Sequence, residues 1–171
     1  SQVIPGVQRM MKRSPEVITS TLGVLIPELK LNLSEWAAEL MAAAVAQLQS
    51  SDQKQRVDAT RAAQALCEGA SSPDLLQRLA DHLADHVSSK KAKQWYERQQ
   101  VAVILTTASR RAVQLRMDAD FFNGIAKTLF DFFGKEGNES AKAAILDAIL
   151  FVADHVDSAG DAGVLGALLT G

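Results

Sequence analysis

The sequence has a single cysteine, Cys67, among its 171 residues. One cysteine excludes an intramolecular disulfide and leaves no cysteine-rich framework for a metal, and this usage is typical of proteins from a reducing compartment. We therefore expect a cytoplasmic localisation.

Strong net charge and long apolar runs are also missing. Lysine plus arginine number 18 against 20 aspartate plus glutamate, which gives a formal net charge of -2. This balance indicates no global attraction to nucleic acid or membrane, so any electrostatic binding must come from local patches. No stretch of about 18 uncharged apolar residues is present, and we expect a soluble protein without a membrane partner. The chain begins without a methionine and ends on LLTG, which suggests a segment excised from a much longer chain.

Proline and glycine are scarce, with 4 and 10 residues, and they sit at the edges of runs filled by alanine, leucine, glutamine and arginine. This composition favours helices, and we find no convincing strand. Ser14 and Ser72 each precede a proline and then an acid, a combination typical of helix starts. Asp118 and Asn138 are caps of the same kind ahead of apolar-periodic runs. The sequence therefore predicts an all-α protein.

The predicted helices repeat with a step of about 40 residues, the size of a HEAT or armadillo hairpin. They cover 15–29, 35–49, 53–69, 73–87, 94–116, 119–133, 139–157 and 162–169. Pairing consecutive helices gives four hairpins, at 15–49, 53–87, 94–133 and 139–169, in one domain over 1–171. Stacked hairpins bury a core that none could bury alone, so we predict a HEAT/armadillo-like α-solenoid. A closed helical bundle is the alternative, but a bundle does not need a repeating step.

The stretch DHLADHV at 81–87 raises the question of a metal site, because His82 and His86 are four residues apart on a predicted helix. A closed zinc site needs four ligands and a catalytic one usually three, and the only other histidine is His155 in a distant helix. We therefore expect no metal and no other cofactor. We interpret the two histidines as the flank of a packing helix, which act through packing or a contact at the repeat edge.

Other candidate reactive or binding residues also suit a packed core. Cys67 lies on a helix without a partner base, and no GxSxG or glycine-rich phosphate loop is present. The phenylalanines of 121–133 have the spacing of a core-facing helix. Trp36 and Trp95 stand at helix starts, where we favour packing between repeats over exposure to a partner. The sequence therefore predicts no enzyme and no small-molecule substrate.

Local basic groups remain as candidate contacts to a partner. The connection SSKKAK carries Lys90, Lys91 and Lys93, and Arg110 and Arg111 end the fifth predicted helix. A basic inter-repeat loop can meet phosphates, which would give a weak RNA contact, or it can meet an acidic partner. The alternatives are a solvated loop and arginines favoured by the dipole at a helix C-terminus.

Residues 13–52, RSPEVITSTLGVLIPELKLNLSEWAAELMAAAVAQLQSSD, resemble a segment from the N-terminal region of the HEAT-repeat translational activator of general amino-acid control. The shared features are the SPE helix start, a leucine-rich helix, an L-x-L-S entry and an aromatic residue before the next helix. The similarity continues through RVDATRAAQALCEGASSPDLLQRLADHLADHV. Members of this family are ribosome-associated and help to activate the kinase that responds to uncharged tRNA.

The resemblance implies a non-catalytic scaffold whose partners are the ribosome and translation-control proteins, although no motif here carries a family binding residue. The alternative is a HEAT-type tubulin-binding module, or another protein-binding module unrelated to translation. Tubulin-binding modules present a tryptophan and basic residues on the turns along one edge. Here the turns LKLN and ASSP supply only Lys30, which counts against that alternative.

Overall fold

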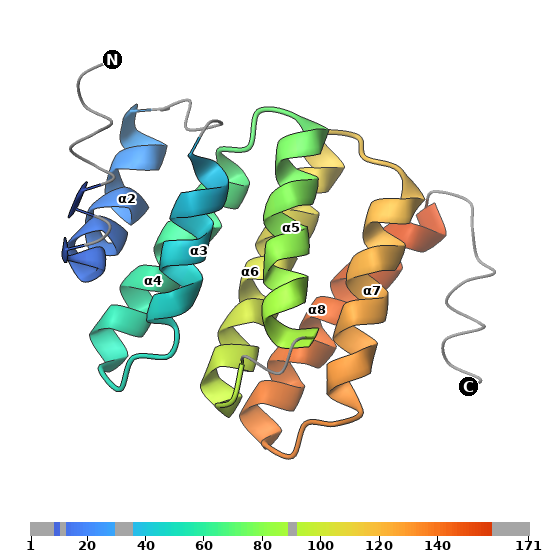
Figure 1. Cartoon of the computed structure of the whole chain (residues 1–171). Helices are drawn as coiled ribbons and strands as arrows, with labels where there is room; N and C mark the ends of the chain where they lie inside the picture. The colour runs from blue at the N-terminus through green and yellow to red at the C-terminus, as the bar shows by residue number, and fades with distance from the viewer. Residues whose placement is uncertain (1–8, 11–12, 30–35, 89–91, 159–171) are drawn as a thin grey trace.

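The computed structural model describes residues 9–10, 13–29, 36–88 and 92–158, and within these ranges the regular structure is α-helical (Figure 1). The helices are α2 (Pro15–Leu29), α3 (Ala37–Gln47), α4 (Gln53–Glu68), α5 (Pro73–Ser88), α6 (Trp95–Gln114), α7 (Ala119–Phe133) and α8 (Glu139–Ser158). Each begins and ends within about two residues of its predicted bounds, the usual uncertainty of helix ends. The predicted helix 162–169 lies outside the described residues.

Three of the predicted caps are formed by side chains at helix starts. Ser72 Oγ accepts a bond from the amide of Leu75 at 3.3 Å, before α5. Asp118 accepts from the amide of Phe121 before α7. Asn138 accepts from two amides of the first turn of α8, at 3.0 and 3.1 Å. Such bonds satisfy amide groups that have no partner within the helix, so the cap residues define where these helices begin.

The helices form two layers that follow a gentle arc (Figure 1). One layer holds α2, α4, α6 and α8, and the other holds α3, α5 and α7, with each helix packed beside the next of its own layer. In the figure α2 and α8 lie at opposite ends of the arc, so the helices stack and do not close into a bundle. The prediction of an all-α solenoid of helical hairpins is confirmed. The exact boundaries of the four hairpins stay a prediction.

The core lies between the two layers and along the contacts within each layer. The apolar stripe of α5 is buried as predicted, and its acids face outward. In α7 the rings of Phe121, Phe122 and Phe132 are buried, and those of Phe130 and Phe133 are partly buried against the same core. The prediction of a core-facing phenylalanine helix is therefore confirmed. None of the helices in the described part of the chain is long and apolar enough to cross a membrane.

Candidate interaction surface

The α3–α4 and α7–α8 connections and residues 92–94 before α6 lie at one edge of the stack, at the bottom of Figure 1. We call this the loop edge. An exposed lysine stands at or beside each connection: Lys54 at the start of α4, Lys93 before α6 and Lys135 before α8. Lys90 and Lys91, which the sequence analysis names beside Lys93, lie outside the described residues. The described part of the loop edge thus carries three exposed lysines, with the exposed acids Asp52 and Glu139 at two of the same connections.

Arg98 holds the α5–α6 connection in place. Its Nη1 donates to the backbone oxygens of Ala92 and Lys93, both at 3.1 Å. Its Nε and Nη2 donate to the two carboxylate oxygens of Glu136 in the α7–α8 connection, with Nη2 3.1 Å from Oε1. One arginine therefore joins two neighbouring connections of the loop edge.

The charges of this pair are stabilised by each other. The hydrogen bond to Glu136 raises the pKa of Arg98. Burial alone would raise the pKa of Glu136, but the bonds from Arg98 and from the backbone amides of Asn138 and Gly137 outweigh it and lower that pKa. A bidentate guanidinium–carboxylate pair with further backbone bonds is the geometry in which such a charge is tolerated away from water.

Arg56 occupies the corresponding place one helix pair earlier. Its Nη1 donates to the backbone oxygens of Ser50 and Ser51, at 2.7 and 3.0 Å, and its guanidinium carbon lies 4.4 Å from the ring centroid of Tyr96. A guanidinium at this distance from an aromatic face is attracted by the ring. The loop edge is therefore held by repeated arginines, which the sequence analysis did not single out.

The two predicted arginines of α6 lie far from this edge. Lys93 precedes α6 and Arg110 lies in its last turns, and a helix rises about 1.5 Å per residue, so the two are roughly 25 Å apart. Arg111 donates twice to the backbone oxygen of Ala70, at 3.0 and 2.8 Å, and once to Gln114. Arg110 is exposed and lies 5.5 Å from the ring centroid of Phe151. The predicted basic residues therefore do not form one patch.

Polar side chains also join α4 to α6 across the layer. Thr60 Oγ1 lies 3.0 Å from Gln100 Oε1, and Gln64 Nε2 donates to Thr107 Oγ1 at 3.0 Å. The partners are 40 and 43 residues apart in the sequence, close to the predicted repeat step. These bonds fix how α4 lies along α6, and so how one helix pair packs on the next.

His86 forms a contact inside the fold. Its ring is 6% exposed, and its Nε2 lies 3.3 Å from Oε2 of Glu97, which is also buried and whose Oε1 accepts from the amide of Gln94. The two residues join the end of α5 to the start of α6. In the part of the chain that the structure covers, no three histidine, cysteine or acidic side chains come together as metal ligands. His86 thus contributes a contact at the repeat edge, as the interpretation of DHLADHV expects, but it lies deeper than the helix flank.

Of the other residues that the sequence analysis discusses, some lie in the core and one lies at the surface. Cys67 is fully buried, and burial, followed by the nearby Glu68 charge, raises the pKa of its thiol to about 12. Trp36 packs against the core, whereas Trp95 is 40% exposed beside Tyr96. The preference for packing therefore holds for Trp36 and fails for Trp95, because the first turn of α6 reaches the loop edge.

Comparison with known proteins assigns this stack of helix pairs to a family. Residues 1–94, more than half of the chain, match the family described as stalled ribosome sensor GCN1, N-terminal. The chain belongs to this family. The match confirms the resemblance to the N-terminal region of the translational activator.

One curated relative of this GCN1-type segment is Protein ILITYHIA of Arabidopsis thaliana. The two are 22% identical over 151 residues, which is 86% of this chain and 6% of the relative. The chain thus spans a small part of the length of the relative it matches. No solved structure matches the chain.

Proposed function

We propose that the chain is a non-catalytic scaffold segment of a longer, cytoplasmic, ribosome-associated translational activator that promotes the kinase response to amino-acid starvation. The observation that carries this proposal is the match of residues 1–94 to the GCN1 N-terminal family. The small share of the relative that the chain spans supports a role as one section of a long solenoid. Solenoids present extended surfaces to partners, which fits a scaffold.

Binding is favoured over catalysis by where the reactive groups lie. Cys67, His86 and Glu97 are buried, and the latter two bond to each other within the fold. His82 and His155 are half-buried, and His155 Nδ1 lies 2.8 Å from the backbone oxygen of Phe151. A nucleophile or a base must reach its substrate to act. The buried side chains therefore suit stability, and the surface is left for recognition.

The loop edge supports a contact to the ribosome. Lys54, Lys93 and Lys135 are exposed along it at a spacing of one helix pair. Lys90 and Lys91 stay a prediction from the sequence. Arg56 and Arg98 fix two of the connections, so the row is held on a rigid frame. A row of fixed cations can bind phosphates or an acidic protein surface, with an affinity that falls as salt rises.

Cosedimentation of the full-length protein with ribosomes in a salt titration tests this function. We expect binding that weakens with salt, and the triple variant Lys54→Glu, Lys93→Glu, Lys135→Glu should lower the affinity by about tenfold or more through the lost contacts. The matched control is the triple variant Arg61→Glu, Arg78→Glu, Lys127→Glu, which changes the charge by the same amount at exposed positions away from the loop edge. Equal loss in the control would show that the loop edge has no special role. Absence of ribosome binding with pelleting on microtubules would overturn the proposal in favour of a tubulin-binding module.

The kinase part of the proposal needs its own measurement. In starved cells that lack the protein, the wild-type gene should restore phosphorylation of the kinase substrate, and the triple loop-edge variant should restore less. If a protein that lacks residues 1–171 restored this phosphorylation to the wild-type level, the segment would not be needed for kinase activation.

A further inference from the structure

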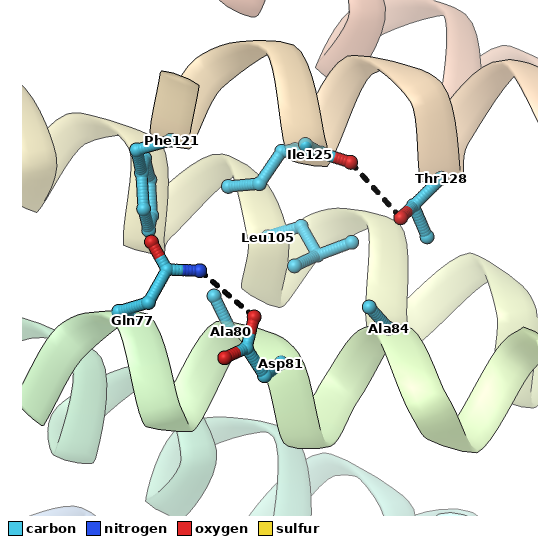
Figure 2. A pocket seen from close by; sticks show the side chains of 9 residues that line it. Gln77, Ala80, Asp81, Ala84, Leu105, Phe121, Ile125 and Thr128 are labelled. Atoms are coloured by element: carbon cyan, nitrogen blue, oxygen red, sulfur yellow. Dashed lines mark hydrogen bonds between the residues drawn. The ribbon is translucent and has the colours of Figure 1, made fainter. Parts of the chain in front are cut away.

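A small groove opens between α5 and α7, on the side of the stack opposite the α2/α4/α6/α8 layer (Figure 2). Figure 2 shows Gln77 and Asp81 of α5 on one wall, Phe121, Ile125 and Thr128 of α7 on the other, and Leu105 of α6 between them. Leu105, Phe121 and Ile125 are buried, whereas Asp81 is exposed. The groove therefore has an apolar floor and a polar rim.

The size of the groove limits what can enter it. It encloses about 80 Å³, whereas one water molecule takes up about 30 Å³ in the liquid. A space of this size accepts a single extended side chain and is too small for a helix. Recognition here must therefore come from one side chain of a partner.

Gly124 keeps one side of the groove open. It lies in the middle of α7, where glycine is less favourable than alanine. A Cβ at this position would meet no atom within 4 Å, and the backbone does not have a positive φ. Neither helix packing nor backbone geometry therefore requires this glycine. Its effect in the structure is to leave space in the wall of the groove.

The exposed charges on the face formed by α3, α5 and α7 favour a partner with positive charge. The exposed charged side chains of α3, α5 and α7 are six acids and two bases: Glu39, Asp74, Asp81, Asp85, Asp120, Asp131, Arg78 and Lys127. Such a surface repels RNA and attracts cationic groups. Among the described residues that line the groove, Asp81 is the charged one, and Gln77 Nε2 orients its carboxylate by donating to Oδ1 at 2.8 Å.

We propose that the α5/α7 groove is a docking site for a basic segment of a partner protein, which inserts one arginine or lysine side chain. The methylene stem lies over Ala84, Gly124 and Thr128, the lining residues that are still open to solvent above the buried floor, and the cationic head meets the Asp81 carboxylate at the rim. Long cationic side chains commonly bury their stems in this way while the charge stays near water. The site is separate from the loop edge and does not depend on ribosome binding.

The test uses NMR of the whole 171-residue chain with a defined probe. The probe is the blocked peptide Ala-Leu-Arg-Leu-Ala, and its matched control has citrulline, which has the shape of arginine without the charge. We expect saturable shifts of the Gly124, Ile125 and Thr128 amide signals with the arginine peptide, and binding about threefold weaker or more with citrulline, because water partly screens an ion pair at an exposed rim.

Two variants locate the binding at the groove. Gly124→Ala fills the wall, and Asp81→Asn removes the charge, and each should weaken binding of the arginine peptide by about threefold or more. Their controls are Gly137→Ala, where a Cβ also meets open space, and Asp131→Asn, an exposed acid outside the groove; both should bind normally. A melting temperature of Gly124→Ala at or above that of the wild type shows that the loss of binding is not a loss of folding.

Three results would overturn the proposal. Equal binding of the citrulline peptide would mean that the groove recognises apolar contact alone. Unchanged binding by Gly124→Ala would place the peptide elsewhere. Stronger shifts of the same signals with a single-stranded RNA dodecamer would assign the face to nucleic acid. Failure of the ribosome experiment, in contrast, leaves these predictions as they are, because no ribosome takes part.

Discussion

Arg56 and Arg98 make the same contact in successive helix pairs. Each guanidinium donates from Nη1 to the two backbone oxygens that lie six and five residues earlier in the chain. They differ in the next partner, because Arg56 lies over the ring of Tyr96, whereas Arg98 pairs with the carboxylate of Glu136. The same backbone anchor is therefore combined with two different links to the following helix pair.

Replacement of Arg98 by alanine should be the most damaging change at the loop edge. It leaves the Glu136 carboxylate, whose side chain is 1% exposed, without its cation, and it leaves two backbone oxygens without a donor. We expect the free energy of unfolding to fall by about 2–4 kcal/mol. Chemical denaturation measures this, with Arg78→Ala, an exposed arginine of α5, as the matched control.

Replacement of Arg56 by alanine should cost less, about 1–2 kcal/mol, because no buried charge is left unpaired there. An equal loss in both variants would show that the backbone anchor, and not the ion pair, carries the stability. Losses no larger than that of Arg78→Ala would contradict both assignments.

The lowered pKa of Glu136 predicts how stability depends on pH. The ordinary pKa of this carboxyl is 4.5, and its folded value is lower. The unfolded chain therefore takes up the proton first as pH falls, so the contribution of Glu136 is complete above about pH 4.5 and is lost as pH falls through the folded pKa. Denaturation of the wild type and of Glu136→Gln between pH 3 and 7 measures the difference. The gap between the two curves should shrink at the acidic end, and a constant gap would contradict this account.

The helices of this fold were predictable because their signals are local. The starts of α5, α7 and α8 follow from Ser72, Asp118 and Asn138, which bond to amides two or three residues ahead. Apolar spacing along α5 and α7 shows which face is buried. Such signals need only a few consecutive residues, so they can be recognised without the tertiary structure.

The roles of the arginines were not predictable in the same way. Arg111 is named in the sequence analysis as a possible partner contact, but its guanidinium is bonded to the oxygen of Ala70, 41 residues away. The separation is close to the predicted repeat step, as for Thr60 with Gln100. A search for polar pairs one step apart would have pointed to such contacts. The α5/α7 groove could not be predicted, because it depends on where Gly124 faces after the helices pack.

Cys67 should be unreactive in the folded protein. Its thiol is fully buried, and its pKa is raised to about 12, so almost no thiolate exists at pH 8. We expect modification by Ellman's reagent to occur only through opening of the structure, at a rate that rises with denaturant. Cys67→Ser should lower the free energy of unfolding by about 1–3 kcal/mol, because the buried hydroxyl needs a partner. Fast labelling of the native protein would contradict the burial of this residue.

Gly23 and Gly124 should respond in opposite ways to alanine, although both lie inside helices. A Cβ on Gly23 in α2 would come within 3.1 Å of Arg61 Cβ and 3.4 Å of the amide nitrogen of Ala62. Both atoms are fixed to the α4 backbone, so the two helices must separate, and overpacking of this kind costs about 1–3 kcal/mol.

Gly124 has open space at the same position, so its replacement adds helix propensity without a clash. We therefore expect Gly23→Ala to lower the melting temperature and Gly124→Ala to raise the free energy of unfolding by up to about 1 kcal/mol. Thermal denaturation of the two variants side by side makes the comparison. If Gly124→Ala were also destabilising, Gly124 would have a packing role in the fold, and its value as a probe of the α5/α7 groove would be lost. If Gly23→Ala were stabilising, α2 would be able to move away from α4 at little cost, and the close approach of these helices would not hold the first helix pair on the stack.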